Sequence, residues 1–129
     1  MKALLTALIA ASLVSGCATI ASGTIQEVTV RAEIAGRPTA ATCTLTNDYG
    51  KTTSDTKGFA QVHRSAKPLT IVCSDSKSLA IGSVTAESHV RAGAMVANVI
   101  TDFCVVSCIV DFASGAVYAY PSEFRVPMQ

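Results

Sequence analysis

Cysteine is the residue type with the most chemistry to offer in this chain of 129 residues. A thiol can be acylated, oxidised to a disulfide or bound to a metal, and the surrounding sequence narrows the choice. The first cysteine stands apart, because a twelve-residue apolar stretch, Ala3 to Val14, ends just before it. The other four lie far downstream. The five cysteines are Cys17, Cys43, Cys73, Cys104 and Cys108.

The residues before Cys17 have the organisation of a secretory signal peptide. Lys2 supplies a positive charge, and the apolar stretch after it is too short to span a bilayer as a permanent helix. The series Val14-Ser15-Gly16-Cys17 resembles the lipobox of bacterial lipoproteins. That resemblance implies a signal peptide over residues 1–16, cleavage before Cys17, and a thioether-linked diacylglycerol on its thiol, with acyl chains such as palmitate. An ordinary signal peptide followed by an accidental cysteine is the alternative.

The residues after Cys17 bear on location. The signal that retains lipoproteins in the inner membrane is usually an aspartate at the next position, which here is Ala18. The lipoprotein resemblance therefore implies the outer membrane, with the protein facing the periplasm. Residues 17–23 form a short lipidated tether. The six residues after the cysteine reach about 20 Å when extended, so we expect the folded part to sit close to its membrane.

Charge and length exclude several classes. The precursor has ten Lys and Arg against nine Asp and Glu, and loss of Lys2 leaves nine against nine. A neutral chain without a basic cluster offers no electrostatic footprint for nucleic acid and no polybasic segment for anionic lipids. The membrane is therefore expected as a partner only through the lipid anchor. Residues 24–129 are enough for one small β-rich domain.

The four downstream cysteines would reach an oxidising compartment, where disulfides are the default, and sequence alone leaves three pairings open. We predict a Cys43–Cys73 bond, because both lie in strands of one module. Cys104 and Cys108 would be about 13 Å apart in a strand but about 6 Å apart in a helix. They are candidates for a disulfide or for buried apolar packing. Without a nearby histidine they make an incomplete zinc site, so no metal is expected.

Residues 24–88 have the pattern of a β-domain. Val28, Val30 and Ala32 alternate with polar residues, which is the period of a strand with one buried face. Short strands separated by Gly, Pro and Asn indicate a small antiparallel β-sandwich, with a turn at residues 36–38. Residues 26–86 resemble the PEGA-type surface modules, although the signature tetrapeptide of that family is absent. The further strands are predicted at residues 42–46, 59–63, 69–74, 80–86 and 124–126.

Residues 90–112 are strongly apolar. We predict a mainly helical element over residues 91–110 that packs its apolar face on the β-module, followed by a left-handed cap at Gly115. The many Val and Ile residues would equally suit a buried strand. The stretch from Asp111 to Pro121 resembles the tails of small proteobacterial lipoproteins. The fold class predicted is therefore mainly β with one helix (α+β).

No catalytic constellation emerges from the sequence. His63 and His89 lie near strand ends or turns, and Asp48, Asp55 and Asp75 lie in turns where a carboxylate can bond its own backbone. We therefore expect a non-enzymatic lipoprotein without a cofactor, with an envelope or structural role or with a protein or glycan to bind. One alternative is an envelope-acting enzyme or enzyme inhibitor. Another is a membrane-contacting or oligomerising module that acts through residues 90–112.

Overall fold

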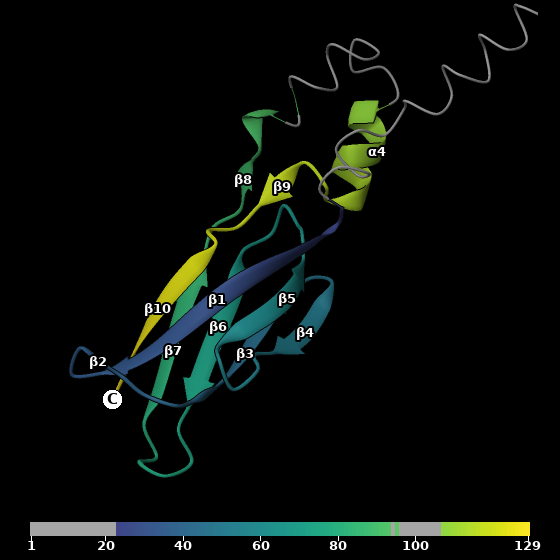
Figure 1. The fold of residues 1–129 in the computed structure, drawn as a ribbon. Coiled ribbons are helices and arrows are strands. Elements are labelled where there is room, and N and C mark those ends of the chain that lie inside the picture. The colour runs from purple at the N-terminus through teal and green to yellow at the C-terminus, as the bar shows by residue number, and fades with distance from the viewer. Residues whose placement is uncertain (1–22, 94, 96–106) are drawn as a thin grey trace, which may run out of the picture.

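The computed structural model of this chain describes residues 23–93, 95 and 107–129 (Figure 1). The predictions for the signal peptide, for lipidation at Cys17 and for Cys104 fall outside these residues. The described chain is mostly β-strand with one short helix, α4. The elements in order are β1 (Ile25–Ile34), β2 (Arg37–Pro38), β3 (Thr42–Asn47), β4 (Gly50–Thr53), β5 (Phe59–His63), β6 (Leu69–Ser74), β7 (Ile81–Ala86), β8 (His89–Val90), α4 (Ser107–Ser114), β9 (Tyr118–Ala119) and β10 (Glu123–Met128).

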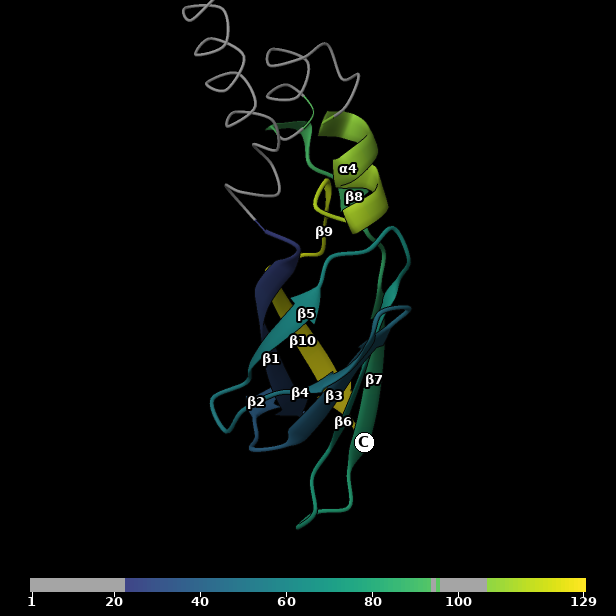
Figure 2. The ribbon, with the colours of Figure 1, turned by 90° about the vertical axis from the view of Figure 1, so that its right-hand side faces the viewer.

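Two four-stranded sheets make up most of the fold. In the first, β1 pairs with β10 on one side and with β5 and the short β2 on the other. In the second, the order is β4-β3-β6-β7 and every neighbouring pair is antiparallel. Figure 2 shows β1, β5 and β10 on one side and β3, β6 and β7 on the other. A separate antiparallel pair, β8 with β9, lies beside α4.

Side chains from both sheets meet in one hydrophobic core. Strand β6 shows the alternation clearly, since Leu69, Ile71 and Cys73 are buried while the residues between them are exposed. Strand β1 contributes Val28 and Val30 in the same way. Each such side chain adds about 1.5–3 kcal/mol by leaving water. The period-two pattern in the sequence therefore reports the buried faces directly.

Strand β10 runs parallel to β1, although the sequence pattern predicted an antiparallel sandwich. The register aligns Val30 with Phe124 and Ala32 with Val126. The direction follows from the connection. Strand β7 ends near the end of the molecule where α4, β8 and β9 lie, and β10 leaves from that same end, where β1 also begins (Figure 1). A strand that starts beside the beginning of β1 and pairs with it must run parallel to it.

The strand predictions were accurate where apolar residues alternate and incomplete elsewhere. Strands β5 and β6 have the predicted bounds. Strand β4 was not predicted, because Gly50–Thr53 contains no apolar residue. The turn predicted at residues 36–38 is displaced. Ala35 and Gly36 form a two-residue turn with positive φ at both positions, which is the geometry that joins two antiparallel strands tightly. Arg37 and Pro38 then form β2.

The predicted helix ends later than residue 110, and several of its apolar side chains face solvent instead of the β-module. The described part, α4, ends at Ser114, and Gly115 follows with φ of 81°, which confirms the left-handed cap. The prediction that the apolar face of residues 91–110 packs on the β-module is wrong for Ile109 and Val110, which are exposed, and Phe112, beyond the predicted bounds, is exposed as well. Within the described part of the chain, no helix has the length and apolar character needed to cross a membrane.

Candidate functional site

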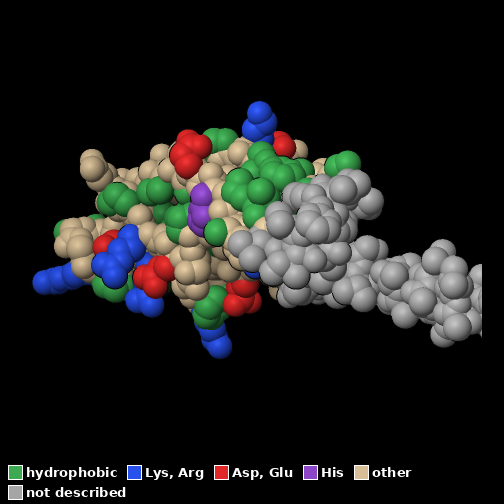
Figure 3. Space-filling model, turned by 90° about the horizontal axis from the view of Figure 1, so that it is seen from above, with side chains coloured by type: hydrophobic (Ala, Val, Ile, Leu, Met, Phe, Trp, Pro, Cys, Tyr) green, Lys and Arg blue, Asp and Glu red, His purple; other side chains and the backbone are tan. Residues whose placement is uncertain are grey.

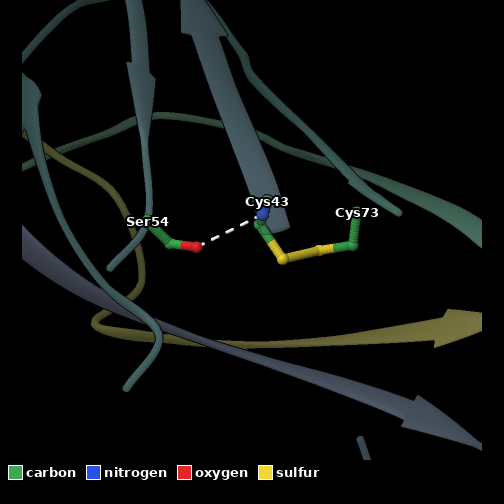
Figure 4. Close-up of a disulfide and its surroundings, with 3 residues drawn as sticks. All are labelled: Cys43, Ser54 and Cys73. Carbon is green, nitrogen blue, oxygen red and sulfur yellow. Dashed lines mark hydrogen bonds between the residues drawn. A yellow bond between two sulfur atoms is a disulfide. The ribbon is translucent and has the colours of Figure 1, made fainter. Parts of the chain in front are cut away.

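A disulfide between Cys43 and Cys73 joins the two central strands of the second sheet, as predicted (Figure 4). The two residues are directly opposite in the β3–β6 register, and their Cα atoms are 4.0 Å apart. Both side chains are buried, with exposed fractions of 2% and 0%. The bond is therefore part of the core and is shielded from reductants in solvent.

The backbone around Cys43 explains why the bridge forms there. The Cys43 N–H donates to Ser54 Oγ at 3.2 Å, and the Cys43 carbonyl accepts from the Ser54 N–H at 2.8 Å. Both polar backbone groups therefore point away from β6. In an antiparallel pair this marks a non-hydrogen-bonded position, where the two facing side chains come closest. The pairing register thus places the two thiols within bonding reach.

Cys108 is also disulfide-bonded and is buried in α4. Since Cys43 and Cys73 bond each other, its partner lies outside the described residues. Within the described residues, no group of three or more His, Cys, Asp or Glu side chains could hold a metal ion. An oxidised Cys108 leaves no thiolate for that role.

A polar groove of about 440 Å³ lies beside the disulfide, at the end of the molecule away from α4. Its walls come from the segment before β3, the turn after β4 and the turn after β6. Thr42 and Ser74 are a cross-strand pair and stand next to the two bonded cysteines. The disulfide therefore holds two walls of the groove together. Its hydroxyl-bearing lining residues are Thr39, Thr42, Ser54, Thr56, Ser74 and Ser76.

Two aspartates line this groove, and both organise their own turns as the sequence predicted. Asp55 Oδ1 accepts from the N–H groups of Lys57 and Phe59, each at 2.8 Å. Asp75 accepts from the Lys77 N–H at 2.9 Å and from the Ser78 hydroxyl at 2.7 Å. The Ser78 and Lys77 bonds lower the pKa of Asp75. Asp75 therefore stays ionised at neutral pH, and both carboxylates stabilise the rims of the groove through their hydrogen bonds. Neither arrangement resembles an acid–base pair.

The third aspartate, Asp48, departs from the prediction. Its carboxylate accepts from the Ser65 hydroxyl, which belongs to the loop between β5 and β6, and not from its own backbone. Ser65 is buried, and its oxygen also accepts from the Lys67 N–H at 3.0 Å. The contact joins the β3–β4 turn to the loop that connects the two sheets.

The two histidines lie in different strands, His63 at the end of β5 and His89 at the start of β8. His63 stacks on Tyr49 with ring centroids 3.8 Å apart, and His63 Nδ1 is 2.8 Å from the Arg64 carbonyl. His89 is exposed at the start of β8. A second, smaller pocket of about 120 Å³ lies beneath the stacked rings, between β4 and β5. Among the described residues, no serine or aspartate is hydrogen-bonded to either histidine, so no nucleophile is assembled around them there.

Arg64 lies where β1, β5 and β9 converge. Its N–H donates to the Thr24 carbonyl at 2.7 Å, and its guanidinium donates to Tyr118 O at 3.1 Å and to Gln26 Oε1 at 3.3 Å. Burial and the nearby Arg91 lower the pKa of Arg64. Such an arginine stays protonated at every physiological pH. Its place in the fold is that of a structural link between the beginning of β1 and the α4 end.

The sequence alone did not reveal the groove. Its hydroxyl side chains come from three separated segments, each of which has an ordinary turn composition. The β3–β6 pairing, with Thr42 opposite Ser74, and the β3–β4 pairing bring these segments together. The sequence feature nearest to the groove was the pair Cys43 and Cys73, and it predicted a stabilising disulfide and not a binding site.

Comparison with protein-family models, with curated protein sequences and with solved structures finds no match to this chain. The resemblances to bacterial lipoproteins and to PEGA-type modules therefore stay predictions from the residues.

Proposed function

We propose that this protein is a lipid-anchored, non-enzymatic lipoprotein of the bacterial outer membrane that displays a small β-sandwich in the periplasm. The buried Cys43–Cys73 disulfide carries the proposal, because such bonds form and persist in oxidising compartments such as the periplasm. It supports the export that the lipobox-like series before Cys17 predicts. The core shared by the two sheets supports the sandwich architecture.

The polar groove is the binding site in this proposal. It is rich in hydroxyl groups, its rims are fixed by Asp55 and Asp75, and the disulfide joins two of its walls. None of the described residues that line it is aromatic. A ligand would therefore be held by hydrogen bonds and not by ring stacking, which suits a polar loop of an envelope protein or the hydroxyl groups of a glycan. A rigid polar groove without a positioned nucleophile favours binding over catalysis.

Lipidation is tested first. Mass spectrometry of the protein from a bacterial envelope should find a mature chain that begins at acylated Cys17. The Cys17→Ser variant should lose its membrane fraction, because one thioether-linked diacylglycerol is the main source of attachment at about 0.8 kcal/mol per buried methylene. A soluble mature protein with an unmodified Cys17 would overturn the lipoprotein proposal.

The groove is tested by photo-crosslinking in the native envelope. A photoreactive amino acid at Ser76, in the groove, should give a specific adduct that mass spectrometry can identify. The control position is Arg125, whose side chain is exposed on β10 and takes no part in the groove. Equal adducts at both positions, or none at Ser76, would count against the groove as the binding site.

A further inference from the structure

The exposed side of α4 has an unusual character for a helix at the surface of a protein. Its one charged residue, Asp111, is completely buried. Ile109, Val110 and Phe112 face outward instead, with exposed fractions of 68%, 46% and 42%. A surface helix in water normally shows the opposite arrangement, with apolar residues facing the core and charged residues facing solvent. Apolar side chains gathered on an outer face commonly mark an interaction surface.

The apolar surface continues onto the neighbouring strand pair. The ring of Phe112 contacts that of Tyr118 edge to face, with centroids 5.8 Å apart. Tyr118 in β9 pairs with Val90 in β8, and Val90 is 44% exposed. We call Val90, Ile109, Val110 and Phe112 the apolar end face. Figure 3, which views the molecule from this end, shows hydrophobic side chains gathered there.

The beginning of β1 lies at this same end. The Thr24 carbonyl accepts from the Arg64 N–H, and the Arg64 guanidinium donates to the Tyr118 carbonyl. Gly115, directly after α4, packs so closely on Arg64 that a Cβ there would meet the Arg64 carbonyl at 2.2 Å. Thr24 is therefore joined through one residue to both β9 and the end of α4. Only six residues, 18–23, separate Thr24 from Cys17.

We propose that the apolar end face docks on the lipid surface in which Cys17 is anchored, so that the domain stands with this end against the bilayer. The inference rests on the proposed lipid anchor. A tether of six residues spans at most about 20 Å, which keeps Thr24 and the neighbouring end of α4 close to the headgroups. Apolar faces of helices bind at the boundary between headgroups and acyl chains, and tethering raises the effective concentration of such a surface.

The geometry favours lipid over a second copy as the occupant. The anchor holds the apolar end face of every molecule next to the membrane. A second copy could cover this face only by entering the narrow space between the face and the bilayer. The described side chains on the outer side of α4 are uncharged, so entering the interfacial region would strip water from no charged group there. The polar groove, at the opposite end, would then face the periplasm.

The absence of tryptophan from the chain makes a clean test possible. The full-length acylated protein would be prepared with Ile109→Trp and reconstituted in vesicles of phosphatidylethanolamine and phosphatidylglycerol. Ile81→Trp is the matched control, since Ile81 is 61% exposed and lies in β7, near the groove end. Bromine-labelled acyl chains in the same vesicles quench a tryptophan that enters the bilayer boundary.

The proposal expects emission from Ile109→Trp to shift to shorter wavelength and to be quenched by the brominated lipid, while emission from Ile81→Trp stays unchanged. Equal quenching at both positions, or none at Ile109→Trp, would overturn it. A shift to shorter wavelength without quenching, together with a crosslinked dimer, would assign the face to a second copy and also overturn it. Mass spectrometry first establishes whether Cys17 is acylated. An unacylated Cys17 would contradict the proposed function, whereas an acylated protein without quenching at Ile109→Trp would contradict the docking proposal alone.

Discussion

Tyr120 shows how one residue links the two sheets. Its hydroxyl donates to the Lys67 carbonyl at 2.7 Å and accepts from Asn47 Nδ2 at 3.1 Å. The same asparagine also donates to the His63 carbonyl at 2.8 Å. At its backbone, the Tyr120 N–H donates to Gln26 Oε1 at 3.1 Å. One largely buried side chain thus connects the ends of β3 and β5 with the loop before β6.

We expect Tyr120→Phe to lower the free energy of unfolding by about 1–3 kcal/mol, because it leaves the Lys67 carbonyl without this buried donor. Urea unfolding at neutral pH measures the change. Burial also raises the pKa of Tyr120. The folded state therefore favours the neutral phenol, and its contribution to stability is complete below the unfolded pKa of about 10 and is lost as the pH rises through the folded pKa.

The native protein should accordingly lose stability above about pH 10 more steeply than the Tyr120→Phe variant, since only the native protein carries this phenol. The difference between the two curves isolates Tyr120 from the other groups that titrate there. Parallel curves would show that burial does not hold the Tyr120 phenol neutral.

At the scale of elements, Gly115 determines how α4 meets the sheets. Its φ is 81°, and a Cβ at this position would lie 2.2 Å from the Arg64 carbonyl. Gly36 is a matched control, with φ of 76° and open space within 4 Å of where a Cβ would lie. Both alanine variants acquire the left-handed strain of about 1–2 kcal/mol. Gly115→Ala must in addition displace backbone.

We therefore expect Gly115→Ala to reduce the urea midpoint clearly more than Gly36→Ala does. Equal losses would mean that α4 can move away from Arg64 without consequence for the domain. Circular dichroism of both variants checks that each retains its strands.

The disulfide is the second determinant at this scale. Removing it in a Cys43→Ala, Cys73→Ala variant opens a loop with a sequence separation of 30 residues. On the chain-entropy account this lowers the free energy of unfolding by about 3–4 kcal/mol. Thermal unfolding without reductant measures the loss. An unchanged melting temperature would show that the β3–β6 register holds the two strands without the bond.

The elements also show what the sequence could predict. Alternation identified β5 and β6 because their apolar residues are buried at every second position, and Gly115 identified the left-handed cap after α4 because the chain has positive φ there. The pattern missed β4, whose residues are held by backbone bonds to β3 and not by burial. It also missed the direction of β10, since alternation looks the same in parallel and antiparallel strands. The groove depends on three distant segments and had no local signal.

At the scale of the whole molecule, the hydrophobic contacts are unevenly distributed. Among the described residues, the main core draws on strands of both sheets, whereas the cluster around Val117 at the α4 end, packed by Met95 and Tyr118, is small and separate. A region with few buried apolar contacts opens at lower free energy than the rest.

Hydrogen exchange of the protein in detergent-free buffer should therefore show faster exchange in β8 and β9 than in β6. Mass spectrometry of peptic fragments that cover the two regions measures the difference. Uniform protection would show that the α4 end unfolds only together with the main core.

The parallel pairing of β1 with β10 has a consequence for biogenesis. Val30 pairs with Phe124, so β1, the first strand of the domain, pairs with a strand near the other end of the described chain. A polypeptide threaded through a translocon enters its destination in order, amino-terminal part first. In the export proposed above, hairpins such as β6–β7 would pair as soon as they emerge, but the first sheet could not be completed until residues 123–128 had crossed. Non-local pairings of this kind slow folding, and here that delay would keep the chain threadable throughout its passage.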